Sequence, residues 1–504
     1  MTTASPIVER LSPASLLAQV SSRFFPNNLE VDNELRKIEI VRVVTGVLAL
    51  IRFFQIYWVA HIIREMSSAE IAMAIATMAT AFMMTVGLLT PLSITAFLVL
   101  SRWSDNFFQT GTLGTSVLIQ LLFVLILLRA GRSHSLDSWL SERNLFPKWM
   151  ARMYVKPSGN EVKCAYSFAL IIYATISFVA LAYHLMDSYW LHGVTVKSLF
   201  LSSYLNKHYT WFRAIDHAAP WALGVVSVSA EIAQSCFQFL MIPLMFVAPG
   251  RFFVKWHGTF FFLISLLFIS LSFLPYWELL LWWLIFFHHR VDPNSAQGSL
   301  PIISKRIYAA YFLLALIFLA GLSWQAQGEP KSGPLAYAKI VARAGGMEIP
   351  IVFDKVDLEM GDRWLLLYRK APGDSDWILT PLSGNDGQRL NYSNFDLLYL
   401  SNHNSDLLYF GTTLRFRRQI IGMPPARLDY YLTRGTGRDQ LLRQITYDYK
   451  VSRLEGKVDY RAVIVENHAS QVKLFSPSDD RLLTTPVISK LYSFDGLTLT
   501  ENRS

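Results

Sequence analysis

The hydrophobic pattern divides the chain into two parts. Long apolar runs recur from position 38 to position 324, and shorter alternating runs follow. A membrane-spanning helix needs about 20 mostly apolar residues. The pattern therefore predicts nine membrane segments: 38–62, 69–89, 92–108, 112–129, 164–186, 219–247, 253–273, 275–288 and 307–325. The segment 275–288 is short, and Pro275 separates it from its predecessor, so the two predict either a tight helical hairpin or a broken element.

Basic residues between the apolar runs predict the orientation. Loops rich in Lys and Arg stay on the cytoplasmic side. The loop 129–163 has the strongest such signal, with Arg129, Arg132, Arg143, Lys148, Arg152, Lys156 and Lys163. Four predicted segments precede this loop, which places the N-terminus on the same side, in agreement with Arg36, Lys37 and Arg42. Further basic residues also look cytoplasmic: Arg251, Lys255, His289, Arg290, Lys305 and Arg306. An even number of crossings must therefore lie between 255 and 289, so 253–273 and 275–288 should both cross or neither should.

The composition changes after the last apolar run. Residues 327–334 are rich in Gly and Pro and read as a linker. Beyond them, the pairs 363–368 with 377–379 and 461–466 with 471–475 flank turn-like sequences and predict hairpins, while 424–432 and 438–444 predict short helices. His403 and His468 are lone histidines in turn-like contexts, typical of solvated loops.

These patterns define the expected fold class: a polytopic α-helical membrane protein, with about eight or nine helical segments and a C-terminal extracytoplasmic β-rich domain. The expected domains are a cytoplasmic N-terminal segment (1–37), a transmembrane domain (38–326), the linker (327–334) and the β-rich domain (335–504). The expected location is a bacterial inner membrane, with the N-terminus cytoplasmic and the C-terminal domain periplasmic.

Composition supports the membrane assignment. Charged residues make up 16% of the chain, below the roughly 25% usual in soluble domains. Aromatic residues make up 14%, which fits aromatic belts at two membrane interfaces. We attribute the net charge of +9 to topology rather than to nucleic-acid binding, because no basic patch belongs to a recognisable binding motif. Cys164 and Cys236 lie in apolar segments and show no metal-binding spacing, which predicts two buried inert thiols.

Ionisable residues inside or at the ends of apolar runs are the candidate functional residues, because a charge in hydrocarbon is costly. The predicted topology places a first group near the outer face: His61, Asp105, His184, Asp187 and Glu278. Arg52 and Glu231 lie deeper, at similar depths, and predict an ion pair between two helices. This pair fits either an architectural clamp or a binding site for the head group of a substrate or quinone.

His184 and Asp187 are three residues apart, a spacing that places them on one face of a helix. A carboxylate beside a histidine stabilises the imidazolium that forms when the ring accepts a proton, so this pair is a candidate general base. An interfacial pair that only anchors the end of the helix explains the spacing equally well.

Several short motifs occur in order along the membrane half: Arg-x-x-x-Gly at Arg42 and Gly46, Gly-Leu-Leu-Thr at 87–90, a loop ending in Ser-Leu-Asp at Asp137, Trp-x-x-Gly at Trp190 and Gly193, and single residues at Glu231, His257 and Phe273. In this order and spacing, residues 38–290 resemble the horizontally transferred transmembrane (HTTM) domain, whose members are bacterial relatives of vitamin K-dependent γ-glutamyl carboxylase.

The resemblance implies an activity and a cofactor. Carboxylases of the family couple oxidation of a reduced quinone to proton abstraction from glutamate and then add CO₂, on the side that carries a β-rich domain. Other bacterial members are implicated in maturing or exporting secreted peptide toxins. The carboxylases carry a Lys shortly before the Trp of Trp-x-x-Gly. Here residues 183–189 contain none, His184 is the nearest base, and Lys197 and Lys207 match no motif.

Three functional hypotheses follow. The first is a membrane enzyme that modifies or matures an exported peptide or protein at the outer face, with a reduced quinone as the cofactor implied by the resemblance. The second is a non-enzymatic maturation or assembly factor whose periplasmic domain binds a partner. A transporter ranks last, because no inverted repeat is evident. The expected partners are the lipid bilayer and a small exported peptide or protein, with no nucleic acid.

Overall fold

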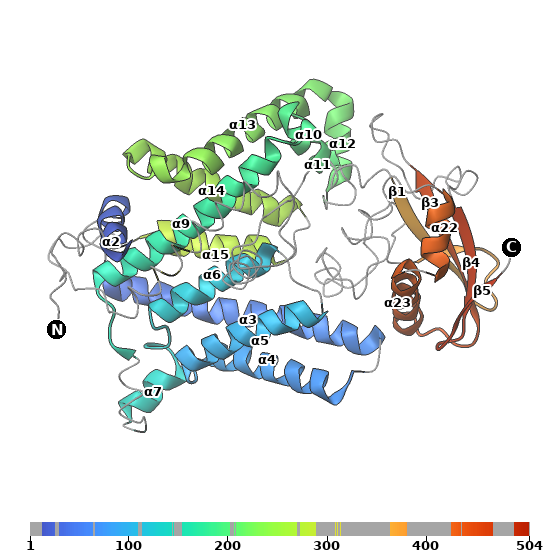
Figure 1. Cartoon of the computed structure of the whole chain (residues 1–504), viewed down its shortest axis with the longest axis horizontal. Helices are drawn as coiled ribbons and strands as arrows, with labels where there is room; N and C mark the ends of the chain where they lie inside the picture. Colours follow the sequence, from blue (N-terminus) through green and yellow to red (C-terminus); the bar gives the residue numbers. More distant parts are fainter. Residues whose placement is uncertain are drawn as a thin grey trace.

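The computed structural model shows a bundle of helices followed by a small sheet domain (Figure 1). It describes residues 13–25, 30–63, 66–108, 113–143, 145, 154–201, 206, 208–269, 273–288, 308, 310, 313, 363–380, 425–434, 436–466 and 488–502. The linker 327–334, His403 and His468 lie outside these residues, as does most of the predicted segment 307–325.

The helical part contains the following elements: α2 (Pro13–Phe24), α3 (Val31–Ile63), α4 (Ser68–Val86), α5 (Thr90–Phe108), α6 (Leu113–Leu127), α7 (Leu136–Glu142), α9 (Gly159–His184), α10 (Ser188–Leu191), α11 (Thr195–Leu201), α12 (Tyr209–Ala218), α13 (Pro220–Leu244), α14 (Ala248–Phe268) and α15 (Leu274–Phe286). Each apolar segment predicted between 38 and 288 coincides with one of these helices. Among the described residues, five helices are long and apolar enough to cross a membrane: α3, α4, α9, α13 and α14.

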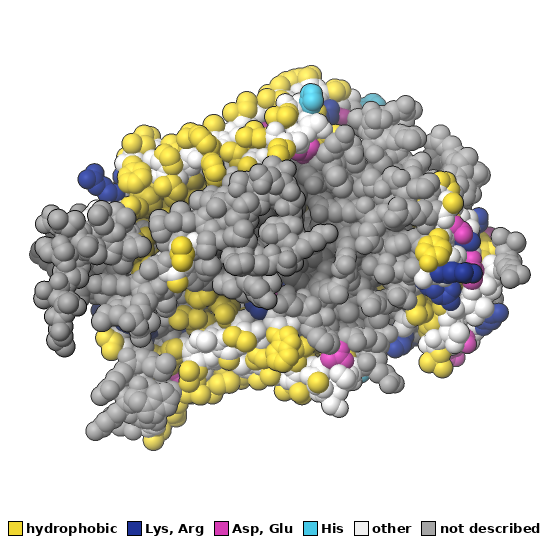
Figure 2. Space-filling view, viewed as in Figure 1, with side chains coloured by type: hydrophobic (Ala, Val, Ile, Leu, Met, Phe, Trp, Pro, Cys, Tyr) yellow, Lys and Arg dark blue, Asp and Glu magenta, His cyan; other side chains and the backbone are white. Residues whose placement is uncertain are grey.

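Burial separates a central helix from peripheral ones. In the most apolar 18-residue stretch of α9, 83% of the residues are buried, against 28% in α4 and α13 and 22% in α14. Large apolar side chains are exposed on the peripheral helices, among them Ile75 and Phe82 of α4, Ile232 and Phe239 of α13 and Phe252 of α14. Figure 2 shows hydrophobic side chains gathered over α13 on one side of the bundle and over α4 and α5 on the other. Apolar surface on this scale is what a lipid environment covers, so these helices indicate a membrane protein.

The bundle has two distinct ends. We call the end at which α3 begins the basic end, because the described part of the loop 129–163 lies there with Arg129, Arg132 and Arg143. At the opposite end, which we call the sheet end, α3 and α9 terminate and the sheet domain follows. Helix α23 of that domain packs against α3.

The segments 253–273 and 275–288 form a helical hairpin, α14–α15. At the basic end, the Lys37 ammonium donates hydrogen bonds to the carbonyls of Leu284 (3.2 Å) and Phe287 (2.8 Å), at the end of α15. At the other end, Phe268 packs against Phe212, which precedes α13. Both arms therefore run between the two ends of the bundle, which favours the hairpin over the broken element.

The sheet domain combines an antiparallel sheet with two helices. Its elements are β1 (Arg363–Lys370), β2 (Ile378–Leu379), α22 (Pro425–Arg434), α23 (Thr436–Val451), β3 (Val458–Glu466), β4 (Ile488–Phe494) and β5 (Leu499–Asn502). The five strands are ordered β2-β1-β3-β4-β5. The first predicted hairpin is present, with Tyr368 opposite Leu379, and so are both short helices. For the second hairpin, 471–475 lies outside the described residues, and β3 pairs with β1 and β4.

Helices α22 and α23 cover one face of this sheet. Leu428 and Ile445 from the helices share a buried cluster with Leu367, Tyr460 and Phe494 from the strands. The sheet domain therefore has a hydrophobic core of its own, while Tyr447 of α23 belongs to the core of the bundle.

Candidate functional site

A cavity of about 450 Å³ lies among α6, α9, α11, α13, α14 and α15. Its volume is within the range of about 300–1,000 Å³ typical of ligand pockets. Apolar side chains such as Ile176, Leu199 and Phe261 form most of its wall. Four residues selected from the sequence also line it: His184, Trp190, His257 and Glu278. The fold thus assembles, in one place, residues that are up to 94 positions apart in the chain (184 to 278).

Glu278 lies in the first turns of α15 and is buried against α9. The Tyr173 hydroxyl, on α9, donates a hydrogen bond to Oε1 of Glu278 at 2.8 Å. The ring of Tyr173 packs edge-on against Phe262 and Trp282, which fixes the position of its hydroxyl. A carboxyl group held this way in an apolar wall can exchange a proton with a bound ligand.

His184 is the last residue of α9, and its ring stacks on that of Trp190 with centroids 4.2 Å apart and 15° between the planes. The indole of Trp190 donates a hydrogen bond to the Ser235 hydroxyl (3.1 Å) on α13. The stack lines the sheet-end part of the cavity and offers a flat aromatic surface to a ring-bearing ligand.

The prediction that His184 and Asp187 share a helical face is wrong. Helix α9 ends at His184, so the helical spacing does not extend to Asp187. The Asp187 carboxylate instead caps α10 by accepting a hydrogen bond from the backbone N–H of Tyr189 at 3.1 Å. Asp187 is not among the described residues that line the cavity. Of the two predicted catalytic residues, the structure therefore places only His184 at the site.

His257 faces the cavity from α14. Its Nε2 lies 2.9 Å from Oε1 of Gln234 on α13, so the imidazole N–H can donate to the amide. The rings of Phe237 and Phe253 flank the imidazole at 4.8 and 5.2 Å. These contacts orient the ring without a charged partner among the described residues.

Sequence reasoning missed the amide side chains in the wall. Both amide atoms of Gln120, Oε1 of Gln238 and Oγ1 of Thr195 are buried and have no hydrogen-bond partner among the described residues. All three residues line the cavity, and Gln120 is only 3% exposed. A buried polar atom left without a partner costs about 1–3 kcal/mol, and a ligand that formed hydrogen bonds with these atoms would remove that cost. The signal in the sequence was a glutamine inside the apolar run 112–129.

The cavity opens toward the lateral, apolar surface of the bundle between α13 and α14, a line of contact that we call the seam. Val226 on α13 and Phe260 and Ile264 on α14 line the cavity, and these side chains are also 49%, 56% and 41% exposed. The small residues Ala230 and Ala233 line the same seam. An apolar molecule dissolved in a bilayer could therefore enter sideways.

Glu231 holds the helix that forms the roof of the cavity. Its Oε1 accepts hydrogen bonds from the backbone N–H of Val196 (2.9 Å) and from the Ser227 hydroxyl (3.0 Å). Ser227 in turn accepts from the N–H of Lys197 (3.0 Å). These contacts satisfy the first N–H groups of α11 from α13, so Glu231 caps a neighbouring helix.

The predicted ion pair between Arg52 and Glu231 is wrong. Arg52 pairs with Asp105 at 2.7 Å, both side chains are buried, and the Thr115 hydroxyl donates to Asp105 at 3.0 Å. Helix α3 packs chiefly on α4 and also on α15 and α23, whereas α13 packs on α9, α11 and α14, so the two predicted partners lie on helices with different neighbours. This arrangement supports the clamp rather than a binding role, because neither Arg52 nor Asp105 is among the described residues that line the cavity.

His61, Lys197 and the two cysteines are not among the described residues that line the cavity. His61 is exposed near the end of α3. The Lys197 ammonium forms an ion pair with Asp216 at 2.7 Å, so this lysine does not replace the missing base. Cys164 is buried as predicted, but Cys236 is exposed on α13, contrary to the expectation.

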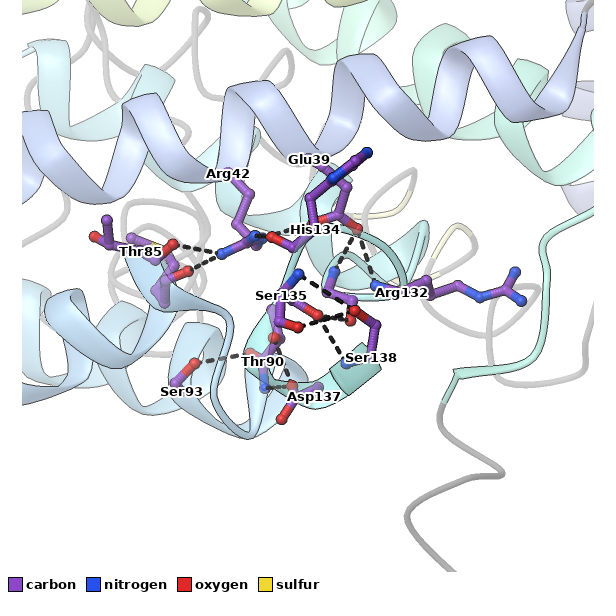
Figure 3. Close-up of polar contacts among 12 residues, drawn as sticks. Glu39, Arg42, Thr85, Thr90, Ser93, Arg132, His134, Ser135, Asp137 and Ser138 are labelled. Atoms are coloured by element: carbon purple, nitrogen blue, oxygen red, sulfur yellow. Dashed lines mark hydrogen bonds and ion pairs between the residues drawn. The ribbon is translucent and has the colours of Figure 1, made fainter. Parts of the chain in front are cut away.

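The motif residues at the basic end form a structural latch (Figure 3). The guanidinium of Arg42 donates to the carbonyls of Met84 (2.6 Å) and Thr85 (2.7 Å), at the end of α4. It also pairs with Glu39 (2.7 Å) and donates to the carbonyl of His134 (3.1 Å). Arg42 thus satisfies carbonyls that the end of a helix leaves without partners.

Asp137 completes the latch. Its carboxylate accepts hydrogen bonds from the backbone N–H groups of Leu89 (2.7 Å) and Thr90 (2.8 Å) and from the Thr90 hydroxyl (2.7 Å). It therefore caps α5, across 47 positions of sequence from Thr90. Arg42 and Asp137 lie at the opposite end of the bundle from His184 and have architectural roles.

The two motif glycines allow close approach. A Cβ on Gly46 would lie 2.1 Å from Oγ1 of Thr85, so only glycine lets α3 pack this closely on α4. Gly193 has φ +69°, and a Cβ there would lie 2.6 Å from Cγ2 of Val228. Glycine at this position lets the turn before α11 pack on α13, beside Glu231.

Comparison of the chain with models of known protein families, with curated proteins and with solved structures gives no match.

Proposed function

We propose that this protein is an HTTM-like enzyme of the bacterial inner membrane that modifies or matures an exported peptide or protein, using a lipid-soluble cofactor bound in the cavity. The observation that carries the proposal is the cavity itself. It combines proton-exchanging groups (His184, His257 and Glu278) with amide atoms that have no hydrogen-bond partner among the described residues, and it has a seam toward the apolar surface.

The distribution of charge supports an extracytoplasmic site. The arginines of the loop 129–163 lie at the basic end, and the positive-inside rule assigns that end to the cytoplasm. The N-terminal segment is on the same side. The sheet domain and the His184–Trp190 stack are at the other end, which the same rule assigns to the periplasm. An exported peptide would reach the cavity from that side.

The cavity fits the reduced quinone that the family resemblance implies. The stacked His184 and Trp190 rings and the apolar wall suit a flat ring, and Gln120 can both accept a hydrogen bond from a ring hydroxyl and donate one to a ring oxygen. The α13–α14 seam suits an apolar tail. When bound, a reduced quinone would supply, through its own oxidation, the driving force for abstracting a proton from the substrate.

The chain's own residues would handle the protons. Glu278 and His257 line the same cavity and can accept or donate a proton at a ligand hydroxyl. Tyr173 orients the carboxyl group of Glu278, and Gln234 orients the imidazole of His257. None of the described residues that line the cavity is a lysine. We therefore propose an imidazole or a carboxylate, rather than a neutral amine, as the base.

A non-enzymatic maturation factor is the second candidate. The observation that favours it is the separate hydrophobic core of the sheet domain, which gives a partner-binding module its own stability at the sheet end. In that case the surface of residues 335–504 would carry the function.

Mass spectrometry of the exported peptides of the host separates the two candidates. We would compare the wild type, a deletion, His184→Ala, Glu278→Gln and the control His61→Ala, an exposed histidine outside the cavity. A peptide mass change, such as one added carboxyl group, that is lost in the deletion and in both cavity variants but kept in His61→Ala supports the enzyme. If the deletion alters export or cleavage while both cavity variants behave as wild type, the maturation factor is correct.

A further inference from the structure

Helix α12 exposes its apolar side. Trp211, Ala214, Ile215 and Ala218 follow the i, i+3, i+4, i+7 spacing of one helical face, and all four are exposed. Trp211 is 63% exposed and Ile215 is 45% exposed. In a helix on the surface of a soluble protein this face would be packed against the core, so here it needs another apolar partner.

The other side of α12 is fixed to the bundle. The ring of Phe212 stacks on that of Phe200, with centroids 4.4 Å apart, and lies edge-on to that of Phe268 at 5.5 Å. Asp216 forms an ion pair with Lys197 of α11 at 2.7 Å. These contacts set the rotation of the helix, so the outward direction of the apolar stripe is a property of the fold.

The stripe continues into the apolar surface of α13. Only Ala219 separates α12 from α13. Trp221, at the start of α13, is 73% exposed, and the exposed side chains Val225, Val228 and Ile232 follow it. Because α13 is long and apolar enough to cross a membrane, the α12 stripe extends a surface that lipid covers.

We infer that α12 is an interfacial helix that lies on the outer leaflet of the bilayer, with the stripe buried at the boundary between head groups and acyl chains. Trp211 and Trp221 are of the residue type that prefers this layer, since an indole has an apolar body and one polar N–H group. We propose that the lipid bilayer, and not another protein, covers this stripe. An amphipathic helix in this position binds by its apolar face while its polar face stays toward water or protein.

The anchor has a consequence for the cavity. Phe212 packs on Phe200, which lines the cavity from α11. Lipid contact at α12 therefore holds the cavity roof at the depth of the interface, while the α13–α14 seam opens into the hydrocarbon below. This inference depends on the membrane location and not on the chemistry proposed for the site, so either can fail without the other.

Spin-label accessibility tests the inference on the full chain in phosphatidylethanolamine–phosphatidylglycerol nanodiscs. Labels would be placed by Ile215→Cys and Ala214→Cys on the stripe and by His217→Cys as an exposed control off the stripe. The background is Cys236→Ser, because Cys236 is exposed, whereas Cys164 is buried. We expect O₂, which partitions into lipid, to relax the labels at 214 and 215 severalfold more than a water-soluble nickel chelate does, and the ratio to reverse at 217.

Two results would overturn the inference. If the nickel chelate reaches 214 and 215 as readily as 217, α12 lies in water. If neither reagent reaches 214 and 215, a protein surface such as a second copy of this chain covers the stripe. The two stripe positions are independent substitutions of exposed side chains, so a folding defect in one leaves the other to decide.

Discussion

The corrected pairing of Arg52 makes a quantitative prediction. Nη2 of Arg52 lies 2.7 Å from Oδ1 of Asp105, the arginine side chain is 4% exposed and the aspartate side chain is 0% exposed. Thr115 supplies a second donor to the carboxylate. Removing one partner of a buried ion pair leaves an uncompensated charge and typically costs about 3–5 kcal/mol. We expect this loss for Arg52→Met and for Asp105→Leu separately.

The double variant should be far more stable than the sum of the two losses predicts. Arg52→Met with Asp105→Leu removes both charges and leaves apolar side chains of similar volume, a change that is often close to neutral. The measurement is the free energy of unfolding of the purified full chain in mixed micelles titrated with SDS, followed by circular dichroism. All variants would be compared at the same detergent concentration.

Glu231→Gln provides the matched control. Because Glu231 caps α11 and does not contact Arg52, its loss should add to that of Arg52→Met within about 0.5 kcal/mol. A strong coupling of Arg52 with Glu231 and an additive Arg52–Asp105 pair would refute the helix arrangement described above.

Three more substitutions test other parts of the fold by the same unfolding measurement. Asp137→Ala should cost at least the roughly 1–2 kcal/mol of a lost helix cap, and an unchanged stability would contradict the latch. Gly46→Ala should cost about 1–3 kcal/mol through overpacking, partly restored by Thr85→Ala, which removes the nearest clashing atom; no rescue would argue against the close approach. In the sheet domain, burial raises the pKa of Asp448, and the ion pair with Arg369 partly opposes this rise, so the stability contribution of Asp448 is lost as pH rises through its folded pKa. Arg369→Gln should cost about 1.5–3 kcal/mol of stability, and more at neutral than at acidic pH, because the unpaired carboxylate is charged at neutral pH. A loss that does not depend on pH would exclude the pairing.

The sequence predicted the helices well because a long apolar run is a local property. The segments from 38 to 288 all coincide with helices, and Glu278 was identifiable as a charged residue in such a run, whereas His257 and Trp190 were noted as motif positions of the resemblance. Which helices are neighbours is a property of packing, and this is why the sequence, read for depth alone, paired Arg52 with Glu231 rather than with Asp105. The prediction that Asp187 shares a helical face with His184 was wrong because α9 ends at His184, three residues before Asp187.

The features that the sequence did not predict depend on uncharged side chains and on backbone groups. Gln120 is buried but has no charge, so a search of the sequence for charged residues in apolar runs did not identify it. The latch consists mainly of contacts from Arg42 and Asp137 to backbone atoms, which no side-chain pattern records. The motif positions of Arg42, Gly46 and Asp137 were noted as features of the resemblance, but their architectural role required coordinates.

If the cavity binds a lipid-soluble ligand, native mass spectrometry of the full chain released from host-lipid nanodiscs should detect that ligand on the protein. Ala233→Phe would fill the cavity, and the control Ile232→Phe changes the lipid-exposed side of the same helix turn. We predict that the wild type and the control carry the same ring-bearing amphipathic molecule, and that Ala233→Phe and Gln120→Leu lose it. If all four proteins release the same bulk lipids and nothing else, the cavity is not a ligand site and the account is wrong.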